Sequence, residues 1–106
     1  MSKYSPDNWA VLKLTFADEP GFCKVLAGWS GGYAQGDSWR LNSGVTKVEK
    51  DGDYYNFHGA SGSIYQCHKD SYGLRMNIAG IYQKIVNTFP EQVTMLDETT
   101  DWTKLV

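Results

Sequence analysis

The chain has 106 residues, of which 42% are hydrophobic, 14% aromatic and 21% charged, and its formal net charge is -2. These values are typical of one globular domain, over residues 1–106, that buries a core without metal or disulfide links. The acidic balance argues against a nucleic-acid polymer as partner, because binding a phosphate backbone requires a basic face.

Residues 1–7 are expected to be loosely ordered, and they lack the apolar segment of a signal peptide. The sequence also has no apolar run long enough to span a bilayer. Both observations favour a cytoplasmic protein without membrane contact. In that compartment Cys23 and Cys67 are expected to be reduced, buried thiols rather than a disulfide or a metal site.

Two strands joined by a turn are predicted next. Residues 9–16 alternate between apolar and other side chains, a pattern typical of a half-buried strand. Pro20 and Gly21 favour a turn, because proline fixes one backbone angle and glycine permits unusual ones. Residues 22–29 have the composition of a returning strand, so the two segments predict a β-hairpin.

A glycine-rich segment separates this hairpin from the third predicted strand. Residues 30–37 are expected to form a loop. The strand is expected to begin at Trp39 and to continue through residues 45–49. Asn42-Ser43-Gly44 interrupts it, and a glycine inside a strand often marks a bulge or a close backbone approach.

Further hairpins follow. Asp51-Gly52 is a favoured pair for a two-residue hairpin turn, because both positions of that turn need a positive φ. Residues 54–58 and 63–68 have strand composition, and residues 59–62 supply the turn between them. Consecutive hairpins of this kind predict an antiparallel meander.

The periodicity changes after residue 73, where apolar residues recur every three or four positions and predict an amphipathic helix. Asn77 could cap its start, and Gly80 weakens the helix but could allow close packing on the sheet. Pro90 ends it. Residues 92–97 predict a short edge strand, and residues 99–106 are expected to be loosely ordered. The periodic positions are Leu74, Ile78, Ile81, Tyr82, Ile85 and Phe89.

These elements predict an α+β fold: a curved antiparallel β-meander sheet of about five or six strands with one helix, from the C-terminal half, packed on one face. The other face of that sheet would stay half-open unless the long loop or a second copy of the chain covered it. A homodimer is therefore expected, since uncovered apolar surface favours association.

Residues 28–44 hold the most unusual composition of the chain, with aromatic rings, glycine and serine beside one charge of each sign. Aromatic faces next to small polar groups favour a ligand- or partner-binding surface. The amides of the glycine pair could bind an anion, and the guanidinium could hold a carboxylate or phosphate. The predicted binding residues are Trp29, Gly31, Gly32, Tyr33, Asp37, Trp39 and Arg40.

No pattern of a catalytic centre, metal site or cofactor site is found. The sequence lacks a P-loop, a dinucleotide-binding glycine motif, CxxC and HExxH. His58 and His68 flank a predicted turn and could lie near each other, with Asp37 as an acid–base partner. Cys67 and His68 would point to opposite faces of one strand, which argues against a shared metal. We therefore predict no cofactor, no metal and no assigned catalytic residue, and we lean against an enzyme.

The segments 28–44 and 62–67 resemble small uncharacterised proteins of tailed bacteriophages, and the resemblance extends over about residues 8–85. It implies expression in the cytoplasm of an infected bacterium. Many proteins of this kind act by binding a host factor or a component of a defence system.

The leading hypothesis is a non-enzymatic phage accessory protein that binds a host or defence-system protein through residues 28–44. A second is a binder of a small anionic ligand such as a nucleotide, with a ring stacked on the base. A third is a small hydrolase or nuclease that uses Asp37 and a histidine. A fourth is a virion or assembly component.

Overall fold

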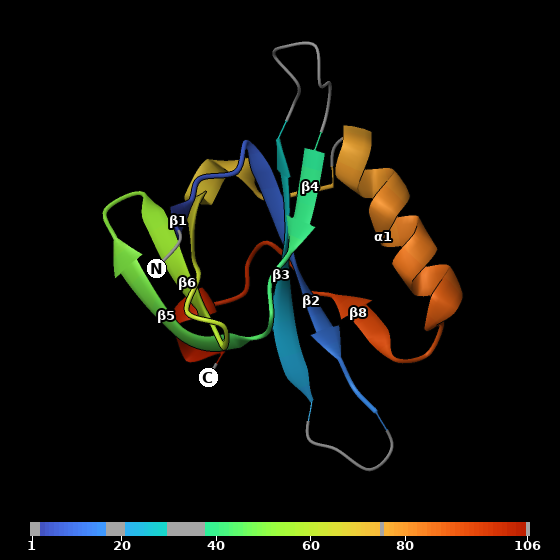
Figure 1. The fold of residues 1–106 in the computed structure, drawn as a ribbon. Coiled ribbons are helices and arrows are strands. Elements are labelled where there is room, and N and C mark those ends of the chain that lie inside the picture. The colour runs from blue at the N-terminus through green and yellow to red at the C-terminus, as the bar shows by residue number, and fades with distance from the viewer. Residues whose placement is uncertain (1–2, 17–20, 30–37, 75, 106) are drawn as a thin grey trace.

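A computed structural model of the chain describes residues 3–16, 21–29, 38–74 and 76–105. Within these residues the chain forms strands, one α-helix and two short 3-10 helices (Figure 1). In chain order they are β1 (Lys3–Tyr4), β2 (Asn8–Leu14), β3 (Phe22–Trp29), β4 (Ser38–Leu41), β5 (Val45–Asp51), β6 (Tyr54–Gly59), β7 (Ile64–His68), η1 (Lys69–Ser71), α1 (Met76–Thr88), β8 (Val93–Met95) and η2 (Trp102–Lys104).

The α+β class is confirmed, but the strands form two sheets rather than one of five or six strands. One sheet, here called sheet A, has the strand order β1-β7-β6-β5, and the other, sheet B, has the order β4-β3-β2-β8. Figure 1 shows three layers, with sheet A at the left, sheet B in the centre and α1 at the right. The face that the sequence left half-open is therefore covered within the chain by sheet A.

Strand β2 shows why a single half-buried sheet was the wrong expectation. Its residues 8–12 and 14 are all buried, whereas a half-buried strand buries every second residue. Trp9 and Val11 belong to the core between the two sheets. Leu12 and Leu14 belong to a second core between sheet B and α1. A strand covered on both faces needs apolar side chains on both. In β2, Trp9 and Val11 provide them on the face toward sheet A, and Leu12 and Leu14 on the face toward α1.

The predicted hairpins are confirmed, with one shift at a turn. Strand β2 pairs antiparallel with β3, and β6 pairs antiparallel with β7. Asp51 pairs with Tyr54, so the two loop residues are Gly52 and Asp53 rather than Asp51 and Gly52. Gly52 has φ of 61°, a backbone angle that suits glycine in such turns.

The predicted third strand is two strands in different sheets. Strand β4 ends at Leu41 in sheet B, and β5 begins at Val45 in sheet A. Residues 42–44 carry the chain from one sheet to the other, so they mark a crossing and not a bulge. Gly44 has φ of 127°, which favours glycine at this crossing.

Both ends of the described chain contact the rest of the fold. Lys3 and Tyr4 pair in parallel with Ile64 and Tyr65 as an edge of sheet A. Trp102 is 3% exposed and belongs to the core between the sheets. The sequence did not indicate these contacts, because isolated aromatic side chains near a terminus give no periodicity from which burial could be predicted.

The buried thiols and the edge position of β8 are confirmed. Cys23 and Cys67 are free and buried, and burial raises the pKa of both thiols. Strand β8 pairs with β2 and lies at an edge of sheet B.

Helix α1 lies where the sequence places it, but two of its details differ. Asn77 is the second residue of the helix rather than its N-cap. Gly80 is exposed, and a Cβ atom added to it would meet nothing within 4 Å. Gly80 therefore does not allow close packing on the sheet. The helix ends at Thr88, two residues before Pro90, which is where proline prevents its continuation.

Replacing Gly80 with alanine is expected to raise the free energy of unfolding by about 0.5–1 kcal/mol, because alanine loses less backbone entropy in a helix and meets no neighbour here. Urea denaturation followed by circular dichroism measures the change. The neighbouring exposed residue provides the reverse control, since Ala79→Gly is expected to lower stability by a similar amount. A destabilised Gly80→Ala variant would contradict the open space at this position.

Candidate functional site

Four of the seven predicted binding residues, Gly31, Gly32, Tyr33 and Asp37, lie outside the described residues. The other three lie on the hairpin formed by β3 and β4. Trp29 ends β3, and Trp39 and Arg40 lie in β4.

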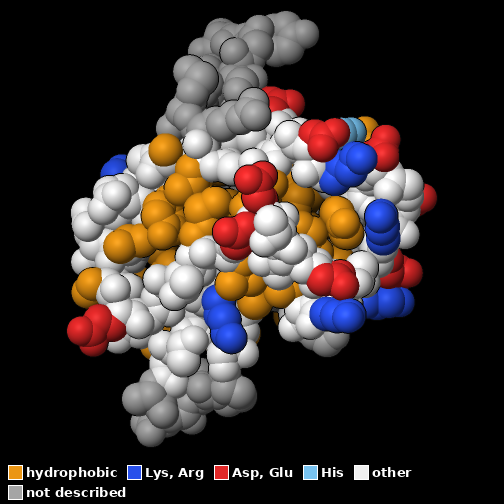
Figure 2. All heavy atoms as spheres, turned by 180° about the vertical axis from the view of Figure 1, so that it is seen from behind, with side chains coloured by type: hydrophobic (Ala, Val, Ile, Leu, Met, Phe, Trp, Pro, Cys, Tyr) orange, Lys and Arg blue, Asp and Glu red, His pale blue; other side chains and the backbone are white. Residues whose placement is uncertain are grey.

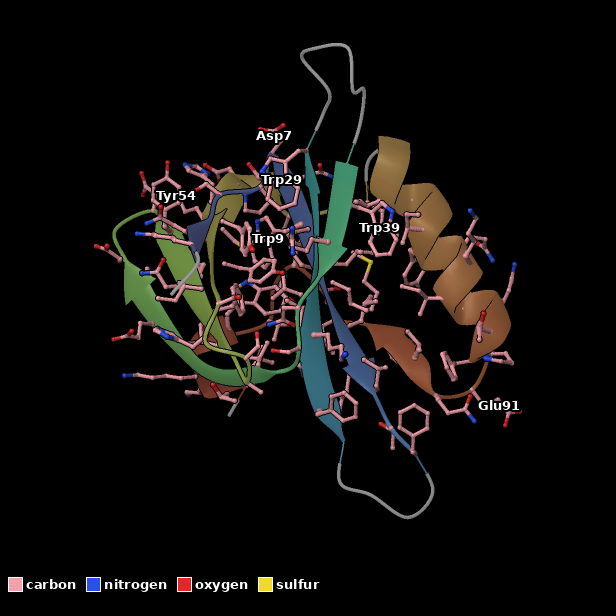
Figure 3. The ribbon with its side chains drawn as sticks, in the orientation of Figure 1. Asp7, Trp9, Trp29, Trp39, Tyr54 and Glu91 are labelled. Carbon is pink, nitrogen blue, oxygen red and sulfur yellow. The ribbon has the colours of Figure 1, made fainter. Side chains whose placement is uncertain are left out.

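The strand register places these three side chains on two faces. Trp39 pairs with Gly28, and Arg40 pairs with Ala27, whose side chain lies in the core between the sheets. Arg40 and Trp29 therefore face sheet A, and Trp39 faces α1. Figure 3 shows Trp39 between β4 and α1, with Trp29 on the opposite side of sheet B. Trp39 and Arg40 thus lie on opposite faces of sheet B, as neighbours on a strand do.

On the sheet A side, the guanidinium of Arg40 lies over the ring of Tyr4, which itself contacts two further aromatic rings. Its Cζ atom lies 4.6 Å from the centre of the Tyr4 ring, a cation–π distance. Tyr4 contacts Trp29 edge-on, with 6.2 Å between ring centroids, and Tyr65 at 5.1 Å. The Trp29 indole N–H donates to the carbonyl of Ser5 at 3.0 Å. Arg40 is thus positioned by stacking, and its binding of a carboxylate or phosphate stays a prediction.

On the helix side, Trp39 forms one wall of an apolar groove. The groove has a volume of about 320 Å³, and its other walls come from the last turns of α1. The Trp39 side chain is 49% exposed, and Phe89 at the far end is 38% exposed. The other lining residues are Ile81, Lys84, Ile85 and Thr88 of α1, and Phe89, which follows the helix directly.

The sequence identified the apolar positions of this helix but not their role in a site. Ile78 is fully buried against sheet B, whereas Ile81 and Ile85 are only partly buried. The apolar stripe is thus wider than the surface that sheet B covers. A stripe of this width in the sequence could have indicated a second contact of the helix.

Strand β4 is an edge strand whose outer side pairs with no other described strand. The backbone N–H of Asn42 donates to the carbonyl of Val25 at 3.0 Å. This bond determines which residues of β4 direct their backbone groups toward β3. Along an antiparallel strand, backbone groups point alternately toward the partner and away from it. Arg40 therefore bonds to β3, and the N–H and C=O groups of Trp39 and Leu41 point outward.

The two histidines, which the sequence allowed to lie near each other, are far apart and do not form a site together. His58 pairs with Ile64 and His68 with Tyr54, at opposite ends of the β6–β7 hairpin. The spacing along β7 corresponds to about 13 Å. His58 contacts Glu49 at 2.7 Å, and this hydrogen bond lowers the pKa of the Glu49 carboxyl. The described residues hold no cluster of three metal-binding side chains.

A second hollow, of about 360 Å³, lies where the ladder between β2 and β8 opens. Tyr72, Leu96 and Asp97 are among its walls. The Tyr72 hydroxyl accepts from the Val11 amide at 3.2 Å and donates to the Leu96 carbonyl. The hydroxyl thus stands between the Val11 N–H and the Leu96 carbonyl, which would otherwise bond to each other directly. The second bond of this pair is intact, because the Leu96 N–H donates to the Val11 carbonyl at 3.0 Å.

Replacing Tyr72 with phenylalanine is expected to lower the free energy of unfolding by about 1–2 kcal/mol, because a partly buried N–H and C=O lose their partner. Burial raises the pKa of Tyr72 from 10.0 to about 12. The stability that depends on the neutral hydroxyl is thus fully present below pH 10 and is lost as pH rises through about 12.

Denaturant unfolding between pH 9 and about pH 12 tests this. The wild type should lose stability more steeply above pH 10 than Tyr72→Phe does, and Tyr54→Phe, at an exposed ring, should follow the wild type. Parallel pH profiles for wild type and Tyr72→Phe would contradict the role of the hydroxyl.

The outer surfaces differ in character. Seen from behind, hydrophobic side chains form a band across the middle of the molecule, with acidic side chains set into it (Figure 2). Toward one side, basic and acidic side chains are interspersed.

Among the described residues, no helix has the length and apolar character needed to cross a membrane. No family model, curated protein or solved structure matches this chain.

Proposed function

We propose that the protein is a non-enzymatic binding protein whose partner, another protein, docks in the groove between β4 and α1. The observation that carries this proposal is the half-exposed Trp39 beside an apolar groove and an open strand edge. Tryptophan is enriched among the residues that contribute most to protein interfaces, above all where it fills a pocket. Following the resemblance to tailed-bacteriophage proteins, the proposed partner is a host or defence-system protein of the bacterial cytoplasm.

The experiment is quantitative capture of partners from bacteria that express the tagged protein. Trp39→Ala is expected to reduce retention of the specific partner at least tenfold, because loss of a central interface tryptophan removes about 2 kcal/mol or more of binding energy. Tyr54→Ala is the matched control, since Tyr54 is also a large exposed aromatic side chain, at 39%, but lies on sheet A. Equal retention by the two variants would contradict the proposal.

The other hypotheses stay predictions with tests of their own. The small-anion hypothesis depends on Gly31 and Gly32, which lie outside the described residues, and calorimetry against a panel of nucleotides tests it. The hydrolase hypothesis predicts loss of turnover in His58→Ala or His68→Ala. A virion component would co-purify with particles, and native mass spectrometry would detect a homodimer.

A further inference from the structure

We infer that the partner binds as an extended strand added antiparallel to β4, with an apolar–acidic–apolar sequence opposite Leu41, Arg40 and Trp39. This inference rests on the proposed function and specifies the chemistry of the partner. It also makes use of Arg40, which the groove itself does not involve.

The backbone of β4 is ready for such a strand. Trp39 and Leu41 each direct one N–H and one C=O away from β3, as the Asn42–Val25 hydrogen bond determines. A residue of an added antiparallel strand that faces Trp39 can exchange both hydrogen bonds with it, and the residue two positions along can do the same with Leu41. Peptide binding by strand addition obtains affinity from such bonds and specificity from pockets for alternate side chains.

The side chains of β4 specify the alternate positions. Directly paired residues of an antiparallel ladder lie on the same face of a sheet. Side chains opposite Trp39 and Leu41 would therefore face α1 and enter the apolar groove against Ile81 and Ile85. The side chain between them would lie opposite Arg40, on the face that contacts Tyr4. A carboxylate there would pair with an exposed guanidinium whose plane Tyr4 already positions.

Arg40 also argues against a second copy of this chain as the occupant. In the symmetric antiparallel register that pairs only residues of β4 through their outward groups, each Trp39 faces Leu41 of the other copy. The pair at the centre is then Arg40 against Arg40 of the second copy, with Cα atoms only about 4.5 Å apart. Like charges directly opposite each other destabilise a sheet, so an acidic partner is favoured over self-association in this register.

The test uses the full chain labelled with ¹⁵N and the peptide acetyl-Thr-Val-Glu-Val-Thr-amide. The expected result is a shift of the Trp39 and Leu41 amides and of the Trp39 indole. Methylation of the backbone nitrogen of either valine should weaken binding at least tenfold, because those amides face β4. Methylation of the glutamate nitrogen, which faces away, should leave binding within about twofold. Equal effects of the methyl groups, the reverse order, or unshifted Trp39 and Leu41 amides would overturn the inference.

A charge reversal tests the acidic position. The wild type should prefer the glutamate peptide over its lysine counterpart by about two- to fivefold, the range for an exposed ion pair. Arg40→Glu should reverse this preference, while an unchanged amide spectrum elsewhere verifies its fold. An identical preference in both proteins would overturn the acidic position.

The two proposals fail separately in these experiments. If capture of a partner depends on Trp39 but the peptides leave the β4 amides unshifted, the proposed function stands and strand addition falls. If the peptides bind as expected but capture is independent of Trp39, the proposed function falls.

Discussion

Replacing Trp102 with alanine is expected to lower the free energy of unfolding by about 3–5 kcal/mol, the range for truncating a large buried aromatic side chain. Trp102 is 3% exposed and contacts three other rings of the core between the sheets. The distances between ring centroids are 4.9 Å to Tyr72, 5.3 Å to Trp9 and 6.2 Å to Phe57. The indole thus joins the last described segment to sheet B, sheet A and the segment after β7.

Urea denaturation measured by circular dichroism tests this loss. Small domains have a total stability of only about 5–15 kcal/mol, so a loss of this size can unfold the protein. Trp102→Phe is therefore the second variant, and it should stay folded with a smaller loss in the free energy of unfolding. Trp39→Ala is the matched control, since it removes the same side chain from a position that is half exposed, and it should change stability by about 1 kcal/mol or less. Equal losses for Trp102→Ala and Trp39→Ala would contradict the assignment of Trp102 to the core.

The local elements could be predicted from the sequence because their signals are local. The glycine at position 52 and Pro90 each act on the backbone within a few residues, whereas most of the turn predicted at Pro20-Gly21 lies outside the described residues. The three- and four-residue spacing of apolar side chains located α1 within two or three residues. Even here the register of the 51–54 turn was off by one residue, because an Asp-Gly-Asp sequence offers two adjacent pairs of turn residues.

The division into two sheets could not be predicted, because it depends on contacts between distant segments. The alternation in β2 indicates which side chains share a face, but not whether a second layer covers the other face. Trp102 stands alone in a polar tail, so only the tertiary structure shows that it fills the space beside Trp9.

Only the part of the candidate site that depends on local geometry could be predicted from the sequence. Period-two geometry alone places Trp39 and Arg40 on opposite faces of β4, and the structure confirms it. The groove needs Ile81 and Ile85, which lie some forty positions along the chain from Trp39 and are brought beside it by the packing of α1 on sheet B. The open edge of β4 results from the crossing at residues 42–44, which a sequence pattern cannot distinguish from a bulge.

Asn42 is the residue that makes this crossing. It is 3% exposed, and its backbone N–H donates to the carbonyl of Val25 at 3.0 Å. Its side-chain oxygen accepts from the Val25 amide at 2.9 Å and from the Gly44 amide at 3.3 Å. The side chain thus takes the place of a backbone carbonyl and continues the pairing of β3 while the chain turns away. Asn42 thus ends the hydrogen-bonded ladder between β3 and β4, directly after Leu41.

Replacing Asn42 with alanine is therefore expected to lower the free energy of unfolding by about 2–3 kcal/mol, because the buried Val25 amide and the Gly44 amide lose their acceptor. Asn87→Ala, on the exposed side of α1, is the control and should change stability by about 0.5 kcal/mol or less. Hydrogen exchange of the Val25 amide should accelerate in Asn42→Ala more than that of amides in β6. Because β4 is held on one side only, the same variant should weaken binding of a strand to its open edge. Unaltered exchange at Val25 would show that another group accepts its hydrogen, and Asn42 would then have no part in positioning the edge.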